Sequence, residues 1–152
     1  MTTRTSQPQN TRDYLYWLSL ALIVVGLVIS GYLSYTKLTN TSVICLEAEA
    51  ISCDVVQHSI YAKFAGIEIA YLGFVAYLML GGVLLLSNQI AVLQEYGHIL
   101  LFGLTLLAFV HAVWLVYVQA FLLAAFCTWC LAHEANITAL FIVSAVRLWR
   151  NL

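Results

Sequence analysis

The sequence contains few charged residues and a single proline. Six residues are Lys or Arg and seven are Asp or Glu, so 9% of the 152 residues are charged, against roughly 25% in soluble domains. The net charge of −1 gives no reason to expect nucleic acid as a partner. With one proline and no low-complexity linker, one compact bundle is expected. Since 63% of the residues are hydrophobic, we expect an all-α integral membrane protein.

The apolar residues form stretches long enough to cross a membrane as helices, which takes about 20 residues. The predicted spans are about 14–35, 67–87, 97–119 and 127–149. The first is longer than the roughly 7–15 apolar residues of a signal peptide, so we expect a retained helix after a disordered cytoplasmic tail, residues 1–13. The last two spans form one uncharged stretch, read as a helical hairpin with a turn near Phe121–Phe126.

Arginines lie near both ends of the chain, Arg4 and Arg12 before the first span and Arg147 and Arg150 at the end of the last. Four spans put both termini on one side, and positively charged ends indicate that this side is the cytoplasm. The two lysines of the first loop are offset there by four acidic residues. This topology predicts that all four cysteines lie on the extracytoplasmic face, where disulfides persist.

The cysteines occur as two pairs: Cys45 and Cys53 with the spacing C-x7-C, and Cys127 and Cys130 as C-T-W-C. The second pair is expected in the first turn of the last helix, whose positive dipole end favours a thiolate. The first pair is expected in a hydrated loop that a soluble protein can reach. This arrangement indicates a relay that passes two electrons from a soluble dithiol to a membrane quinone by successive exchange.

Two other uses of the cysteines remain open at this point. They could be structural staples of a non-catalytic membrane scaffold, or four thiolates around zinc. The disulfide pattern at rest is also open: Cys45–Cys53 with Cys127–Cys130, or Cys53–Cys127. No metal is expected, because the compartment is oxidising and C-x7-C is an unusual zinc spacing.

Residues Asp54–Gly66 have apolar side chains at spacings of three and four. This pattern predicts a short amphipathic helix on the membrane surface between the first two spans. Such a helix could cap a quinone pocket or only anchor the loop.

The chain resembles the vitamin K epoxide reductase family, specifically its bacterial-type homologues, from Tyr14 to about Trp149. The matching features are a loop pair of cysteines, a serine six residues after the second of them, a glycine in the second span and a C-x-x-C that opens the fourth. In this sequence they are Cys45, Cys53, Ser59, Gly73, Cys127 and Cys130.

The resemblance implies a role for each of these residues. Cys130 faces the quinone, and Cys127 is its disulfide partner. Cys53 exchanges with Cys127, and Cys45 exchanges with an external thiol protein. Ser59 lies near the quinone head group. The quinone would be of the ubiquinone, menaquinone or phylloquinone type.

Two positions depart from the animal members of the family: Ile69 replaces an Asn and Glu134 replaces a Tyr, both of which hold the vitamin K head group. We therefore expect quinone reduction in support of disulfide formation, with vitamin K quinone or epoxide reduction as the alternative. Many bacterial members carry a fused thioredoxin-like domain. None is expected here, so a separate periplasmic thioredoxin-fold thiol oxidase should supply the thiols, at a bacterial plasma membrane.

A second bacterial family of quinone-linked thiol oxidases also has four helices and two cysteine pairs. Its C-x-x-C lies in the first outer loop, which is the reverse of the order found here.

Among the ionisable residues within the predicted spans are His111, His133 and Glu134, and such residues are candidates for function by default. His133 and Glu134 lie within one turn of Cys130, where either could give a proton to a reduced quinone. His111 lies in the third span. We take Glu134 and His111, with Ser59 and Cys130, as the candidate quinone-binding residues.

Overall fold

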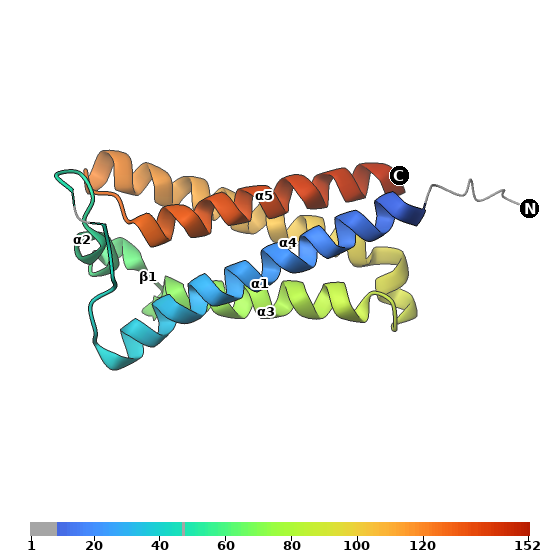
Figure 1. The fold of residues 1–152 in the computed structure, drawn as a ribbon, viewed down its shortest axis with the longest axis horizontal. Coiled ribbons are helices and arrows are strands. Elements are labelled where there is room, and N and C mark those ends of the chain that lie inside the picture. The colour runs from blue at the N-terminus through green and yellow to red at the C-terminus, as the bar shows by residue number, and fades with distance from the viewer. Residues whose placement is uncertain (1–8, 47) are drawn as a thin grey trace, which may run out of the picture.

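The computed structural model describes residues 9–46 and 48–152, and for residues 9–13 the backbone alone. Among these residues the long helices are α1 (Gln9–Thr39), α3 (Ile69–Leu86), α4 (Ala91–Tyr117) and α5 (Thr128–Asn151). They alternate in direction (Figure 1), and α1 and α4 each pack against both α3 and α5. Each contains a segment long and apolar enough to cross a membrane. The expected all-α four-helix membrane bundle is thus confirmed.

The four helices share one apolar core, with Ile23 from α1, Tyr77 and Leu80 from α3, Leu101 from α4 and Leu140 from α5. Helices α1 and α3 approach closely at Gly26, where a Cβ atom would overlap the ring of Tyr77. Small residues at such crossings are typical of membrane bundles, because dispersion contacts replace the missing hydrophobic drive.

Polar side chains connect the helices inside the bundle. The amide of Asn136 donates to the Tyr77 hydroxyl at 2.9 Å and to the carbonyl of Leu22 at 3.0 Å, joining α5 to α3 and α1. Thr105 and Ser144 join α4 to α5 by a hydroxyl contact of 2.6 Å. The frame therefore satisfies these groups internally, as a lipid environment requires.

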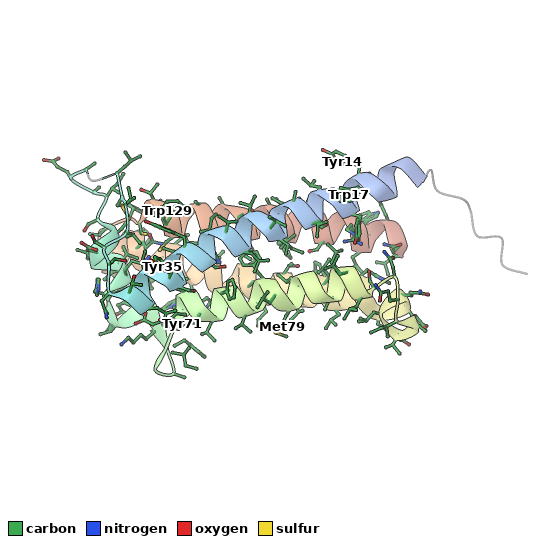
Figure 2. All side chains as sticks on the ribbon, turned by 60° about the horizontal axis from the view of Figure 1, so that its bottom comes forward. Tyr14, Trp17, Tyr35, Tyr71, Met79 and Trp129 are labelled. Carbon is green, nitrogen blue, oxygen red and sulfur yellow. A yellow bond between two sulfur atoms is a disulfide. The ribbon has the colours of Figure 1, made fainter. Side chains whose placement is uncertain are left out.

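The start of α1 and the end of α5 lie at the end of the bundle that is far from the cysteines (Figure 1). The start of α1 and the end of α5 share one end of the bundle, and the connection from α1 to α3 lies at the other, which we name the loop end (Figure 1). Tyr14 and Trp17 lie toward the first end, and Tyr35, Tyr71 and Trp129 at the loop end (Figure 2). Aromatic side chains at both ends match the two interfaces of a bilayer.

Helix α1 begins earlier than predicted. Residues 9–13, assigned to the tail, are its first residues, because no proline or glycine after Pro8 interrupts its backbone hydrogen bonding. The rest of the predicted tail, with Arg4, lies outside the described residues.

The turn before Cys127 is shorter than predicted. Helix α4 continues as a π-helical turn, η2 (Val118–Leu122), closed by the bond from the Leu123 N–H to the Val118 carbonyl at 2.9 Å. Ala124 then adopts a positive φ of 48°, which ends the helix. The reversal occupies only the last residues of the predicted range Phe121–Phe126.

A short helix does lie between the first two spans, as predicted, but it does not extend over the whole of Asp54–Gly66. The helix α2 spans Cys53–Gln57, a 3-10 turn η1 spans Ile60–Ala62, and strands β1 (Lys63–Phe64) and β2 (Ile67–Glu68) form a small antiparallel hairpin. Ala65 and Gly66 both have positive φ, so the chain reverses where the helix was expected. The Lys63–Glu68 pair, 3.7 Å apart, spans the hairpin.

Candidate functional site

The first pair of cysteines, which we name the outer pair, is a disulfide between Cys45 and Cys53. Cys45 lies in irregular chain and is partly exposed, whereas Cys53 begins α2 and is buried, with 2% of its surface exposed. An attacking thiol from outside therefore has access to the sulfur of Cys45 rather than to that of Cys53.

The second pair, which we name the inner pair, consists of free thiols. Cys127 is the N-cap of α5 and fully buried, and its sulfur accepts from the backbone N–H of Cys130 at 3.4 Å. A hydrogen bond from the Cys130 thiol, the largest effect, outweighs burial and lowers the pKa of Cys127 to about 7. Neither disulfide pattern left open by the sequence describes this state, in which one pair is oxidised and the other reduced.

A short backbone pairing brings the two pairs together. The N–H of Ser52 donates to the carbonyl of Phe126 and the N–H of Phe126 to the carbonyl of Ala50, each at 2.9 Å. Cys53 directly follows one side of this pairing and Cys127 the other. At the outer edge, the sulfur of Cys45 lies 3.9 Å from the Thr128 hydroxyl. Residues far apart in the sequence thus form one site.

Trp129, between the two cysteines of the inner pair, clamps the loop of the outer pair. Its indole N–H donates to the carbonyl of Ile44 at 2.6 Å, and its ring lies 4.8 Å from that of Tyr32. The Tyr32 hydroxyl in turn accepts from the N–H of Ile44 at 3.1 Å. The residue before Cys45 is therefore held from both sides.

An apolar cavity lies beside the inner pair, between α1, α3, α4 and α5. Aliphatic side chains of α1, α3 and α4 form much of it, including Leu33, Ile69 and Leu115. Its open space is about 80 Å³, several times the ~10–15 Å³ that one water needs. The polar residues that line it include Gln57, Ser59, Gln119, Cys130, His133 and Glu134. An apolar pocket with few convergent polar groups is typical of ligand sites.

Glu134 is the most unusual residue of this cavity. It is 4% exposed, its Oε1 accepts from the amide of Gln119 at 2.9 Å, and its Oε2 has no hydrogen-bond partner among the described residues. The oxygen of Gln119 accepts from the backbone N–H of Cys127 at 3.0 Å. A buried polar atom left without a partner is costly in a lipid-like interior, so a ligand group that pairs with Oε2 would be stabilised there.

The structure brings together most of the predicted site residues. Ser59, Cys130 and Glu134 line the cavity, and the Ser59 hydroxyl donates to the carbonyl of Val56 at 2.8 Å. His111 is not among the residues that line it: its ring packs edge-on to Phe64, 6.4 Å between centroids. His111 lies one helical turn before Leu115 in α4, and Leu115 does line the cavity.

Sequence reasoning missed Gln57 and Gln119, which touch the inner pair. The side-chain amide of Gln57 lies 3.9 Å from the sulfur of Cys127 and 3.7 Å from that of Cys130. The available signal was an uncharged amide one turn after Cys53 and another at the end of a long apolar run. Within residues 9–46 and 48–152, no three His, Cys, Asp or Glu side chains are grouped so as to hold a metal ion.

A disulfide beside a helix-capping dithiol, placed at one end of a membrane bundle and next to an apolar cavity, defines a membrane redox protein. The model of the vitamin K epoxide reductase family matches residues 17–145, and the chain belongs to that family. The resemblance seen in the sequence is therefore confirmed. Membership supports an oxidoreductase role in the membrane, in a family that generally uses quinones and works with thioredoxin-like partners.

Proposed function

We propose that the protein is a thiol:quinone oxidoreductase that reoxidises a thioredoxin-fold partner and reduces a membrane quinone to quinol. The observation that carries the proposal is the contiguity of an accessible disulfide, a dithiol with one buried and one half-buried sulfhydryl residue, and an apolar cavity. Disulfide formation in secreted proteins is the expected outcome.

The relay begins when a thiolate of the reduced partner attacks the sulfur of Cys45 and breaks the Cys45–Cys53 bond. The second partner thiol then closes the partner's disulfide and leaves the outer pair reduced. Cys53 next attacks Cys127 of the oxidised inner pair, and Cys45 resolves that mixed disulfide, which restores the outer pair.

The reduced inner pair completes the cycle at the cavity. Formation of the Cys127–Cys130 bond releases two electrons to the quinone, and the two thiol protons balance those on the quinol oxygens. The sum is partner dithiol plus quinone giving partner disulfide plus quinol. The free thiols of this pair favour exchange chemistry over a scaffold with two structural staples.

We propose that the quinone head group enters the cavity beside Cys130, with Ser59 and Glu134 as polar contacts. Glu134 is the strongest of these, because it lines the cavity and its Oε2 has no hydrogen-bond partner among the described residues. We propose no direct contact for His111, because it is not among the residues that line the cavity. Ile69 in that wall favours a plain quinone over an epoxide, as the sequence suggests.

We further propose that the loop end faces the extracytoplasmic side of a bacterial plasma membrane, with both termini in the cytoplasm. The support is the clustering of the cysteines at one end and of Arg147 and Arg150 at the other. Oxidised thiols persist on the outer side, and positive residues are retained on the inner side.

The test is quinone reduction by the purified protein in detergent, driven by a reduced thioredoxin-fold dithiol protein. We expect quinone-dependent oxidation of that partner, abolished in Cys130→Ala and unchanged in Glu95→Gln, an exposed position of α4.

The outcomes separate the alternatives. Oxidation of the partner that does not depend on quinone would contradict the proposal, as would full activity in Cys130→Ala. No activity with ubiquinone, menaquinone or phylloquinone, and disulfides inert to mild reductant, would favour the stapled scaffold.

A further inference from the structure

Gln57 is the residue whose side chain contacts both sulfurs of the inner pair. Its Nε2 lies 3.9 Å from the sulfur of Cys127 and 3.7 Å from that of Cys130, within range for N–H···S bonds. An amide nitrogen carries two hydrogens and accepts none, so both contacts donate toward sulfur. A thiolate accepts such bonds more strongly than a thiol, because the acceptor is charged.

The position of Gln57 is fixed by the rest of the site. Only 8% of its surface is exposed, so water competes little for its amide. Its backbone carbonyl accepts from the ammonium of Lys37, which also pairs with Glu68 at 3.4 Å. Gln57 ends α2, the five-residue helix that begins at Cys53. The segment that carries the inner cysteine of the outer pair therefore also carries a donor to the inner pair.

We propose that Gln57 is a positioning residue of the dithiol, which holds the reduced inner pair in its reactive form by donating hydrogen bonds to its sulfurs. This inference rests on the proposed function only in taking the inner pair as the exchange site. It assigns to an uncharged residue a part in setting how readily that pair is oxidised.

The physical consequence has a definite sign. A donor that stabilises the thiolate stabilises the reduced pair relative to its disulfide, and the disulfide accepts hydrogen bonds only weakly. The Gln57 amide is one of the contacts that lower the pKa of Cys127. Its removal should therefore raise that pKa and make the inner pair easier to oxidise.

The experiment compares Gln57→Leu, similar in volume but without a donor, with Gln57→Glu, which puts a negative charge near the thiolate. The thiolate absorbance is titrated against pH, with Cys127→Ala as the blank, and the oxidised fraction of the pair is measured in a glutathione redox buffer. We expect Gln57→Leu to raise the pKa of Cys127 by about half a unit to one unit, and Gln57→Glu to raise it further.

The redox buffer gives the second readout. At a pH about two units above the pKa of Cys127, where the reduced pair is ionised, the ratio of oxidised to reduced inner pair in Gln57→Leu should rise about threefold to tenfold, in step with the shift in pKa. The control is Gln94→Leu, which removes an exposed amide bonded to the carbonyl of Asn88 and should change neither quantity.

A merely packing role would leave the pKa and the redox ratio unchanged in Gln57→Leu, and that result would overturn the inference. Thermal unfolding and retention of the Cys45–Cys53 disulfide check that each variant is folded; Gln57→Glu gives an independent reading if the leucine variant is not. Neither measurement uses quinone or partner. A wild-type protein that fails to reduce quinone but shows these shifts would therefore contradict the proposed function and leave the role of Gln57 standing.

Discussion

The outer pair and the inner pair each consist of two cysteines, but their surroundings differ. The outer pair lies in irregular chain, and the backbone next to Cys45 is held by Trp129 and Tyr32. The inner pair is built into a helix terminus, with Cys127 as the N-cap and donors from the backbone and from Gln57. The comparison teaches that access is set by the loop and thiolate stability by the helix.

The largest expected effect separates the two pairs by function. Cys45→Ala removes the sulfur that an external thiolate can reach, so partner-driven turnover should be lost. When the fully reduced variant is mixed with quinone, a single turnover should still occur, because the inner pair is intact. Stopped-flow measurement of quinol formation checks both. Cys130→Ala is the complementary control and should lose the single turnover as well.

Survival of partner-driven turnover in the Cys45→Ala variant would contradict the assignment of the outer pair. Loss of the single turnover in that variant would show instead that the outer pair takes part in the quinone step.

The second effect concerns the thiolate of the inner pair. Because the pKa of Cys127 is lowered to about 7, a larger fraction of this thiol is ionised near neutral pH than of an ordinary thiol of pKa about 8.5. The sign follows: the thiolate forms as pH rises through 7 and is lost on acidification. Ultraviolet absorbance of the thiolate, with Cys127→Ala subtracted, should rise with a midpoint near pH 7. A midpoint above about 8.5 would remove the contrast between the pairs.

The third effect tests the cavity beside the inner pair. Glu134→Leu removes the carboxyl whose Oε2 has no hydrogen-bond partner among the described residues. Loss of one such hydrogen bond is expected to raise the quinone concentration for half-maximal rate about tenfold. Exchange between partner and outer pair should be unchanged, and Glu95→Leu is the matched control. A variant with unaltered dependence on quinone would exclude Glu134 from the ligand site.

The smallest effect loosens the outer pair alone. Trp129→Phe keeps an aromatic ring but removes the indole donor to the Ile44 carbonyl, a bond worth about 1 kcal/mol. A small thiol should then reduce the Cys45–Cys53 disulfide about fivefold faster. Trp149→Phe, at an 84% exposed position, should have no effect. Equal rates in the two variants would mean that the clamp does not restrain the loop.

The sequence predicted the frame well because membrane spans depend on one local property, the length of apolar stretches. The helices α3 and α5 lie close to their predicted bounds. The loop was harder: apolar spacing over Asp54–Gly66 predicted a helix, whereas positive φ at Ala65 and Gly66 makes a hairpin. Local spacing contains no information about that reversal.

Site residues could be predicted where the residue type alone indicates reactivity. They could not be predicted where their importance depends on contacts across the fold. The cysteines and Glu134 could be chosen from the sequence, because thiols and a carboxyl in an apolar span are rare. Gln57 and Gln119 could not, because an amide becomes important only through the group that it meets. His111 was chosen by the same rule as Glu134, but it is not among the residues that line the cavity.

The most direct test of the relay is whether the two pairs exchange through Cys53 and Cys127. A variant that keeps only these two cysteines, Cys45→Ser with Cys130→Ser, should form a Cys53–Cys127 disulfide under mild oxidation, detected by mass spectrometry of the digested protein. The control that keeps Cys45 and Cys130 should form little of the corresponding bond. Failure of Cys53 and Cys127 to link in the folded variant, or equal linking in the control, would contradict transfer from the outer pair to the inner pair.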